Sequence, residues 1–141
     1  MPLTSLLYIN DVPIECINKA ATSYHVPAEL IIAVLKTENG RNGMATPNDN
    51  GTFDYGPMQI NTVWLNQLQT YGYTKNMLQY NPCVNAWVGT WILGRRIAST
   101  PNFWRGVGAY HSYTNSENVP YQNKVYKNYN LLHHFLNTVT I

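Results

Sequence analysis

The chain has 141 residues, the length of one domain and enough to bury a hydrophobic core. Apolar residues make up 45% and charged residues 11%, a composition that excludes a disordered or fibrous protein. The net charge of +2 is small for a nucleic-acid-binding protein, and no apolar run reaches the ~20 residues of a membrane span. We therefore expect one globular domain over residues 1–141, with no bound nucleic acid and no membrane span.

The first part of the chain predicts two helices separated by a short break. Asp11 can cap a helix over Pro13–Tyr24, whose apolar residues recur on one face. Pro27 suits the first position of a second helix, Ala28–Asn39, which is apolar almost all round and should be the central buried helix. Two glycines should end this second helix, Gly40 and Gly43.

The remaining elements are one small β region and further helices. Residues 43–60 are rich in turn-forming residues and predict a small, irregular β-hairpin. A long helix should start at Asn81-Pro82 and place Trp87 and Trp91 in the core. The other expected helices cover Thr62–Thr70, Asn102–Tyr110 and Tyr121–Asn137. The predicted fold class is therefore mostly α (α+β).

The two cysteines, Cys16 and Cys83, are too few for a cysteine-rich zinc site. An even pair in a small, tyrosine-rich chain favours a disulfide and an oxidising compartment, and two free buried thiols are the alternative. A bridge between them would close a long loop, which is worth roughly 4 kcal/mol in the chain-entropy model.

Elimination among the seven acidic residues leaves two candidates for chemistry, Glu38 and Asp54. The other five occur at helix starts, in a turn sequence or in a polar loop: Asp11, Glu15, Glu29, Asp49 and Glu117. Glu38 continues an apolar stripe at the end of a helix, where burial and the helix dipole should both raise its pKa. The alternative explanation for Glu38 is that its side chain only reaches past the helix end into water. The alternative explanation for Asp54 is that it caps a turn.

A carboxyl that stays protonated near neutral pH can act as a general acid, and two carboxyls flanking a cleft can cut a glycosidic bond. The eleven tyrosines and four tryptophans are consistent with a sugar site, because aromatic rings stack on sugar faces. Four of these rings are equally compatible with a sugar site and with the core: Trp64, Trp104, Tyr55 and Tyr110. The histidines have no metal-ligand spacing, so we expect no metal and no cofactor.

Four segments together resemble the family 1 lytic transglycosylases, in the order in which that family carries them: Pro27–Gly40, Asp54–Asn61, Gly106–Ser112 and Tyr121–Val125. The resemblance spans roughly residues 12–129 and implies a lysozyme-like fold. It also implies cleavage of the MurNAc–GlcNAc β-1,4 bond of peptidoglycan, with Glu38 as acid and then base and a 1,6-anhydroMurNAc product. The residues that it implies for substrate binding are Tyr55, Met58, Gln59, Tyr110, His111 and Tyr121. Tyr110 would position Glu38 or the substrate through its hydroxyl.

The chain departs from the family pattern mainly at Asp54. Most members have no acid there, whereas the segment Asp54–Asn61 also resembles the part of animal C-type lysozymes that carries their second catalytic Asp. Hydrolysis by Glu38 and Asp54 is therefore an alternative, and a non-catalytic glycan-binding assembly protein is another. Asn39 and His111 also differ from the residues common in the family.

The short length and single cysteine pair further resemble the small transglycosylases of type III and type IV secretion, pili and conjugation. This resemblance implies a protein partner in such an apparatus, and we expect the enzyme itself to be a monomer. The segment Leu3–Ile9 is too short for a signal peptide, and no basic residue precedes Lys19. We expect a periplasmic protein whose chain here is the mature form.

Overall fold

The computed structural model describes residues 7–139. The chain forms two short hairpin strands, then two helices, a small sheet and a further series of helices. The first half contains β1 (Tyr8–Ile9), β2 (Val12–Pro13), α1 (Ile14–Tyr24), α2 (Ala28–Glu38), β3 (Ala45–Pro47), β4 (Phe53–Tyr55) and β5 (Ile60–Asn61). The second half contains the 3₁₀ turn η2 (Thr62–Trp64), α3 (Leu65–Gln69), α4 (Lys75–Tyr80), α5 (Pro82–Ala98), α6 (Phe103–Ala109) and α7 (Asn115–Val139). Within residues 7–139, no helix is both long and apolar enough to cross a membrane.

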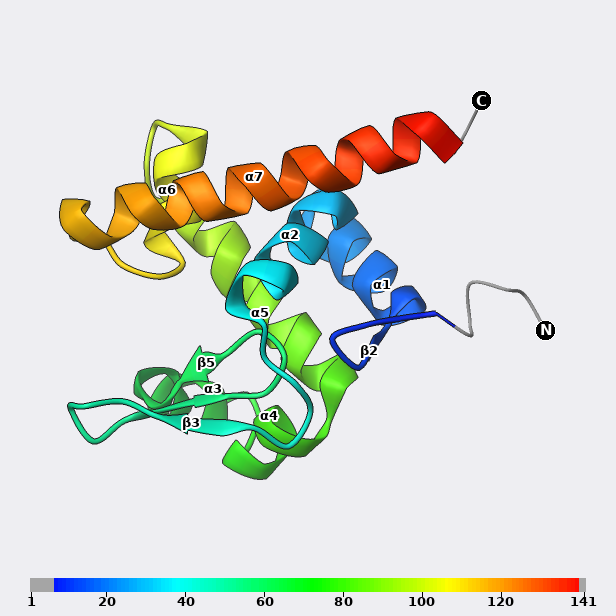
Figure 1. Cartoon of the computed structure of the whole chain (residues 1–141). Coiled ribbons are helices and arrows are strands. Elements are labelled where there is room, and N and C mark those ends of the chain that lie inside the picture. Colours follow the sequence, from blue (N-terminus) through cyan, green and yellow to red (C-terminus); the bar gives the residue numbers. More distant parts are fainter. Residues whose placement is uncertain (1–6, 140–141) are drawn as a thin grey trace.

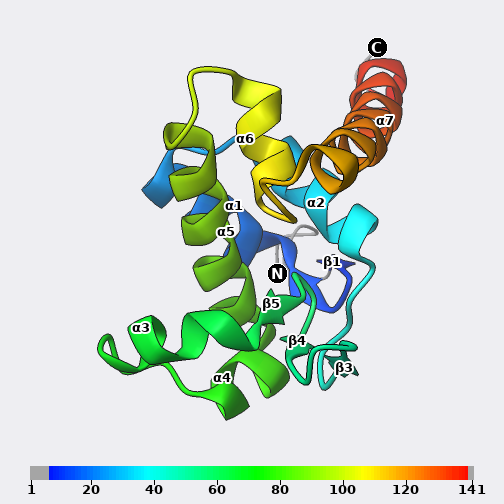
Figure 2. The same ribbon diagram turned by 90° about the vertical axis from the view of Figure 1, so that its left-hand side faces the viewer.

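Most of the helices form one part of the molecule, and the small sheet forms another together with α3 and α4 (Figure 1). α7 packs along α2 and α6, and α5 packs against α1 and α6. The antiparallel sheet β3–β4–β5 lies at the far end of the molecule from α7, with α3 and α4 beside it (Figures 1 and 2). The mostly α fold with a small β region near residues 43–60 is thus confirmed.

The start of α1 differs from the prediction. Asp11 does not cap the helix, because it lies in the turn of the β1–β2 hairpin with a positive φ of 70°. Its carboxylate instead accepts a hydrogen bond from the backbone N–H of Asn42 and pairs with Arg41 at 3.4 Å. Pro13 occupies the N-cap position and provides no side-chain hydrogen bond. The strands of two residues each are too short to show an alternating pattern in the sequence.

The prediction of a buried central helix is confirmed for α2. Five of its eleven residues are buried: Leu30, Ile31, Ala33, Val34 and Leu35. The predicted end of this helix is wrong, because the left-handed cap conformation is adopted by Asn39 and not by Gly40. Its φ is 56°, and its N–H donates to the carbonyl of Leu35. Asn tolerates this conformation better than most residues, so the helix ends directly after Glu38.

The later helices agree with the sequence except in two places. α4 was not predicted, because its six residues lack a clear apolar period. α7 begins at Asn115, before the predicted Tyr121, and contains Pro120 in its second turn. Trp87 and Trp91 pack against the core, as predicted, but each is only half-buried.

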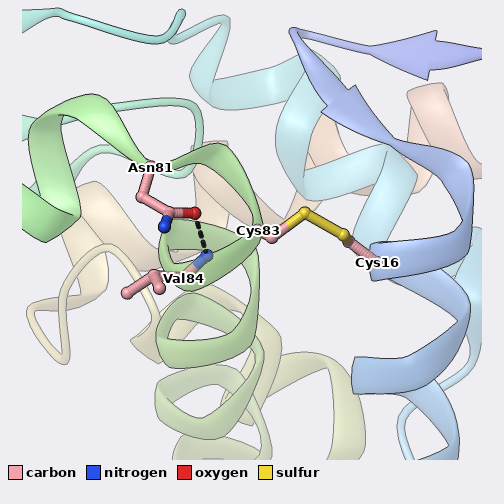
Figure 3. Close-up of a disulfide and its surroundings, with 4 residues drawn as sticks. All are labelled: Cys16, Asn81, Cys83 and Val84. Atoms are coloured by element: carbon pink, nitrogen blue, oxygen red, sulfur yellow. Dashed lines mark hydrogen bonds between the residues drawn. A yellow bond between two sulfur atoms is a disulfide. The ribbon is translucent and has the colours of Figure 1, made fainter.

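The disulfide between Cys16 and Cys83 is present and joins α1 to the first turn of α5, as Figure 3 shows. The two Cα atoms are 5.4 Å apart, and the two cysteines are 67 positions apart in sequence. Beside the bridge, the side chain of Asn81 accepts a hydrogen bond from the N–H of Val84 at 3.1 Å (Figure 3). This contact confirms Asn81 as the N-cap of α5, with Pro82 at the first helical position.

Candidate active site

A cleft of about 660 Å³ contains five of the eight residues that the sequence singles out. Glu38 comes from the end of α2, and Asp54 and Gln59 come from β4 and the turn that follows it. Tyr110 and His111 come from the end of α6. We call Glu38, Tyr110 and His111 the helical wall of the cleft, and Asp54, Gln59 and Asn61 the sheet wall. Residues that are far apart in sequence therefore meet at one solvent-accessible site.

Glu38 is the last residue of α2, and a tyrosine from α7 holds its side chain in place. The hydroxyl of Tyr121 donates a hydrogen bond to Oε2 of Glu38 at 2.6 Å. The pKa of Glu38 is raised to about 7, chiefly because burial penalises its charge, and the negative charge of Asp54 acts in the same direction. The Tyr121 hydrogen bond and the positive charge of Lys124 act in the opposite direction. Glu38 can therefore carry its proton near neutral pH.

The hydroxyl of Tyr110 hydrogen-bonds the turn of the sheet wall. Its hydroxyl donates to the backbone carbonyl of Met58 at 2.7 Å and so ties the two walls of the cleft together. Burial, followed by the charges of Glu38 and Asp54, raises the pKa of Tyr110 well above its usual value. The rings of Tyr110 and His111 both stack on Tyr121, with centroids 6.5 and 5.1 Å away. Tyr121 is thus buried behind the helical wall and fixes Glu38 from there.

Asp54 lies at the centre of β4, where it pairs in register with Thr46 on β3 and Asn61 on β5. The side-chain amide of Asn61 donates to Oδ1 of Asp54 at 2.8 Å and also to the hydroxyl of Thr52. This hydrogen bond from Asn61 fixes the orientation of the Asp54 carboxylate. The sequence contains Asn61 within the same segment as Asp54, but without the strand register its contact with Asp54 could not be identified.

The turn between β4 and β5 is strained and firmly held. Gln59 has a φ of 53°, which L-residues with large side chains seldom adopt, and its side chain donates to the carbonyl of Gly56 at 3.0 Å. Gly56 also has a positive φ, and a Cβ there would collide with the amide of Asn85. Asn85 is fully buried on α5 and bonds the backbone of this turn at both Tyr55 and Met58. A single buried amide therefore anchors the sheet wall to the central helices.

Two predicted substrate contacts are not on the surface of the cleft. The side chain of Met58 is fully buried and that of Tyr55 is 4% exposed, so both belong to the core. A buried side chain cannot contact a glycan, and Met58 contributes only its carbonyl, which accepts from Tyr110. In this segment, the side chains of Tyr55 and Met58 therefore pack the turn against the core and do not face the cleft.

The cleft also contains two residues that the sequence did not single out as a pair, Trp64 and Arg96. The guanidinium of Arg96 lies 4.9 Å from the ring centre of Trp64 and 4.9 Å from that of Tyr113. It also donates to the Tyr113 hydroxyl at 3.0 Å. These residues come from η2, α5 and the loop before α7, so no sequence spacing indicates that they meet.

The arrangement provides one carboxyl that can be protonated and a second, hydrogen-bonded carboxyl on the other wall of a polar cleft. Asparagines and aromatic rings line the same cleft, and such groups bind sugar hydroxyls and sugar faces. Within residues 7–139, no group of three or more His, Cys, Asp or Glu side chains could hold a metal ion. The chemistry available to these residues is acid–base cleavage of a glycan.

Comparison with known proteins agrees with this chemistry. Residues 15–132 match the transglycosylase SLT domain. Protein IpgF of Shigella sonnei is 32% identical over 120 residues, which cover 82% of this chain and 79% of the relative. Invasion protein IagB of Salmonella typhimurium (strain SL1344) is 30% identical over 132 residues, covering 90% and 82%. The chain belongs to the SLT transglycosylase family and is a peptidoglycan lytic transglycosylase.

Proposed function

We propose that Glu38 is both the acid and the base of the cleavage reaction. The protonated carboxyl gives its proton to the oxygen that joins C1 of MurNAc to GlcNAc, and the C1–O bond breaks. The resulting carboxylate then takes the proton of the MurNAc C6 hydroxyl, whose oxygen forms a new bond to C1. The products are a 1,6-anhydroMurNAc end and a free GlcNAc 4-hydroxyl, and Glu38 is protonated again. The observation that carries this proposal is the pKa of Glu38, raised to about 7 in a cleft of glycan-binding character.

Asp54 is proposed to stabilise the positive charge that develops on the sugar ring during bond cleavage. Its carboxylate is oriented by Asn61 and is close enough to Glu38 to affect its pKa. Asp54 also supports a second candidate reaction, in which water rather than the C6 hydroxyl attacks C1, as in a lysozyme. Gln59 and His111 are proposed to contact the glycan from the two walls, and Tyr121 to position Glu38.

Mass spectrometry of the muropeptides released from purified sacculi distinguishes these reactions. A 1,6-anhydroMurNAc end is lighter than a reducing end by one water, so the two products have different masses. We expect anhydro ends from the wild-type protein. Hydrated ends would show that the reaction is hydrolysis and not the proposed one, and the absence of any released fragment would contradict both reactions.

The enzyme is further proposed to act in the periplasm, where it opens the wall locally for a secretion or pilus apparatus. The intact disulfide supports an oxidising compartment, and one relative carries the name invasion protein. Replacement of Glu38 by Gln in the host should block assembly of such an apparatus while the protein remains in the periplasmic fraction. Assembly at the wild-type level would contradict this role without affecting the proposed chemistry.

A further inference from the structure

A second hollow lies on the side of α5 that faces α1 and α3, and it shares no residue with the catalytic cleft. Its volume is about 420 Å³. Five aromatic rings and one cation line it, and we call it the aromatic groove: Tyr24, Tyr71, Tyr73, Trp87, Trp91 and Arg95. All of these rings except that of Tyr71 pack against the core, and all five remain at least partly accessible to solvent.

Rings of the aromatic groove also pack against one another. Tyr24 packs edge-on against Trp87 with ring centres 4.9 Å apart, and Tyr71 packs edge-on against Trp91 at 6.3 Å. Tyr71 is 64% exposed. Rigid, half-exposed rings bind the apolar faces of sugars at a small cost in conformational entropy.

The aromatic groove adjoins the catalytic cleft through a pair of tryptophans. Trp64 lines the cleft and packs edge-on against Trp91, which lines the groove, with centres 5.9 Å apart. Arg96 covers Trp64 at 4.9 Å, and Arg95 covers Trp91 at 5.0 Å. Adjacent residues of α5 therefore serve the two sites, and a row of cations and rings connects them.

The charge of the aromatic groove fits an anionic ligand. Arg95 lines it, and a smaller hollow on the other side of Trp87 contains Lys19. Among the residues that the structure describes, no carboxylate lines either hollow. Peptidoglycan carries free carboxylates on the peptide stems of its MurNAc residues, so a wall polymer offers both sugar faces and negative charges.

We propose that the aromatic groove is a second binding site for peptidoglycan, where rings stack on sugars and Arg95 pairs with a carboxylate of a peptide stem. This inference rests on the proposed function, because the ligand is the polymer that the cleft cuts. Two sites on one long polymer hold an enzyme far more tightly than either site alone, because the second contact forms at high local concentration. The groove thus keeps the enzyme on the wall between cleavage events.

The test is sedimentation with purified sacculi, with all proteins carrying Glu38→Gln so that the polymer stays intact. Tyr71→Ala and Arg95→Gln each alter an exposed side chain of the aromatic groove and leave the core in place. Each should weaken binding roughly fivefold, through loss of one of two linked contacts. Tyr8→Ala and Lys127→Gln are the matched controls, because these exposed residues lie away from both sites and should leave binding unchanged.

Strands of chitin, which have β-1,4-linked sugar rings but no carboxylates, separate the two contacts. Tyr71→Ala should weaken binding to these strands, whereas Arg95→Gln should bind them as well as the parent protein does. Parent-like binding of both groove variants to sacculi would overturn the proposal, and so would equal losses in the control variants. The products of the Glu38-containing enzyme are measured separately, so failure of the groove and failure of the proposed reaction give different results.

Discussion

The two walls of the cleft hold their carboxyl groups in opposite ways. On the helical wall, Glu38 is the half-buried last residue of a buried helix and accepts a hydrogen bond from the hydroxyl of Tyr121. On the sheet wall, Asp54 is also half-buried, but it lies on a three-residue strand and accepts from the amide of Asn61. Desolvation at the first position raises the pKa of Glu38 and so favours its neutral acid.

The difference suits the two carboxyl groups to the different tasks proposed for them. A proton donor needs an environment in which its charge is costly, and a charge stabiliser needs one in which its charge is tolerated. The negative charge of Asp54 also raises the pKa of Glu38, so the sheet wall supports the protonated state proposed for Glu38. Changes on either wall should therefore have distinguishable effects.

The largest effect is expected from removal of the acid. Glu38→Gln keeps the shape of the side chain but cannot donate or accept the catalytic proton, so release of muropeptides should fall by about a thousandfold or more. Far-ultraviolet circular dichroism should show an unchanged helix content. Retention of more than a tenth of the wild-type rate would remove Glu38 from its proposed role.

Removal of the charge on the sheet wall should cost less. Asp54→Asn should lower the cleavage rate roughly 10- to 100-fold, by loss of electrostatic stabilisation in the transition state. It also removes a charge that raises the pKa of Glu38, so the fall of the rate at high pH should begin at lower pH than in the wild type. A pH–rate profile measures both effects, and an unchanged rate and profile would reduce Asp54 to a strand residue.

Replacement of Tyr121, which lies behind the helical wall, should shift the pH–rate profile in the other direction. Tyr121→Phe removes a hydrogen bond that lowers the pKa of Glu38, so the rate should begin to fall at higher pH than in the wild type. The rate below that point should change only about two- to fivefold, because the acid itself remains. Tyr126→Phe, on the exposed face of the same helix, is the matched control. A shift to lower pH would show that Tyr121 does not stabilise the carboxylate.

The sequence was sufficient for the parts of the site that depend on local pattern. Glu38 was identified because it continues the apolar stripe of a helix at the end where the dipole disfavours an anion. Asp54 was identified because the other acids have local structural explanations. The disulfide followed from an even cysteine pair, and the structure confirms it.

Contacts between distant segments could not be derived in the same way. The bond from Tyr121 to Glu38 joins residues 83 positions apart, and the bond from Asn85 to the Tyr55 carbonyl spans 30. Asn85 did leave a signal, since a polar residue on the buried face of an apolar helix requires hydrogen-bond partners. Its partners depend on how α5 packs against the sheet, which no local pattern contains. The same applies to Trp64 and Arg96, which meet only in the folded cleft.

The smallest effect concerns stability, and it tests the helical wall without substrate. The folded-state pKa of Glu38, about 7, lies above its usual value of 4.5, so the folded state binds more protons between these values. The stability of the wild type should therefore decline as pH rises through this window.

Glu38→Gln should have the higher melting temperature by about 3–5 °C at about pH 8, and the gap should shrink toward about pH 5. Glu15→Gln, in the exposed first turn of α1, should instead lower the melting temperature slightly, since an acid there favours the helix. A gap for Glu38→Gln that is equal at both pH values would mean that Glu38 has the same pKa in the folded and unfolded chains, and the contrast between the two walls would then be lost.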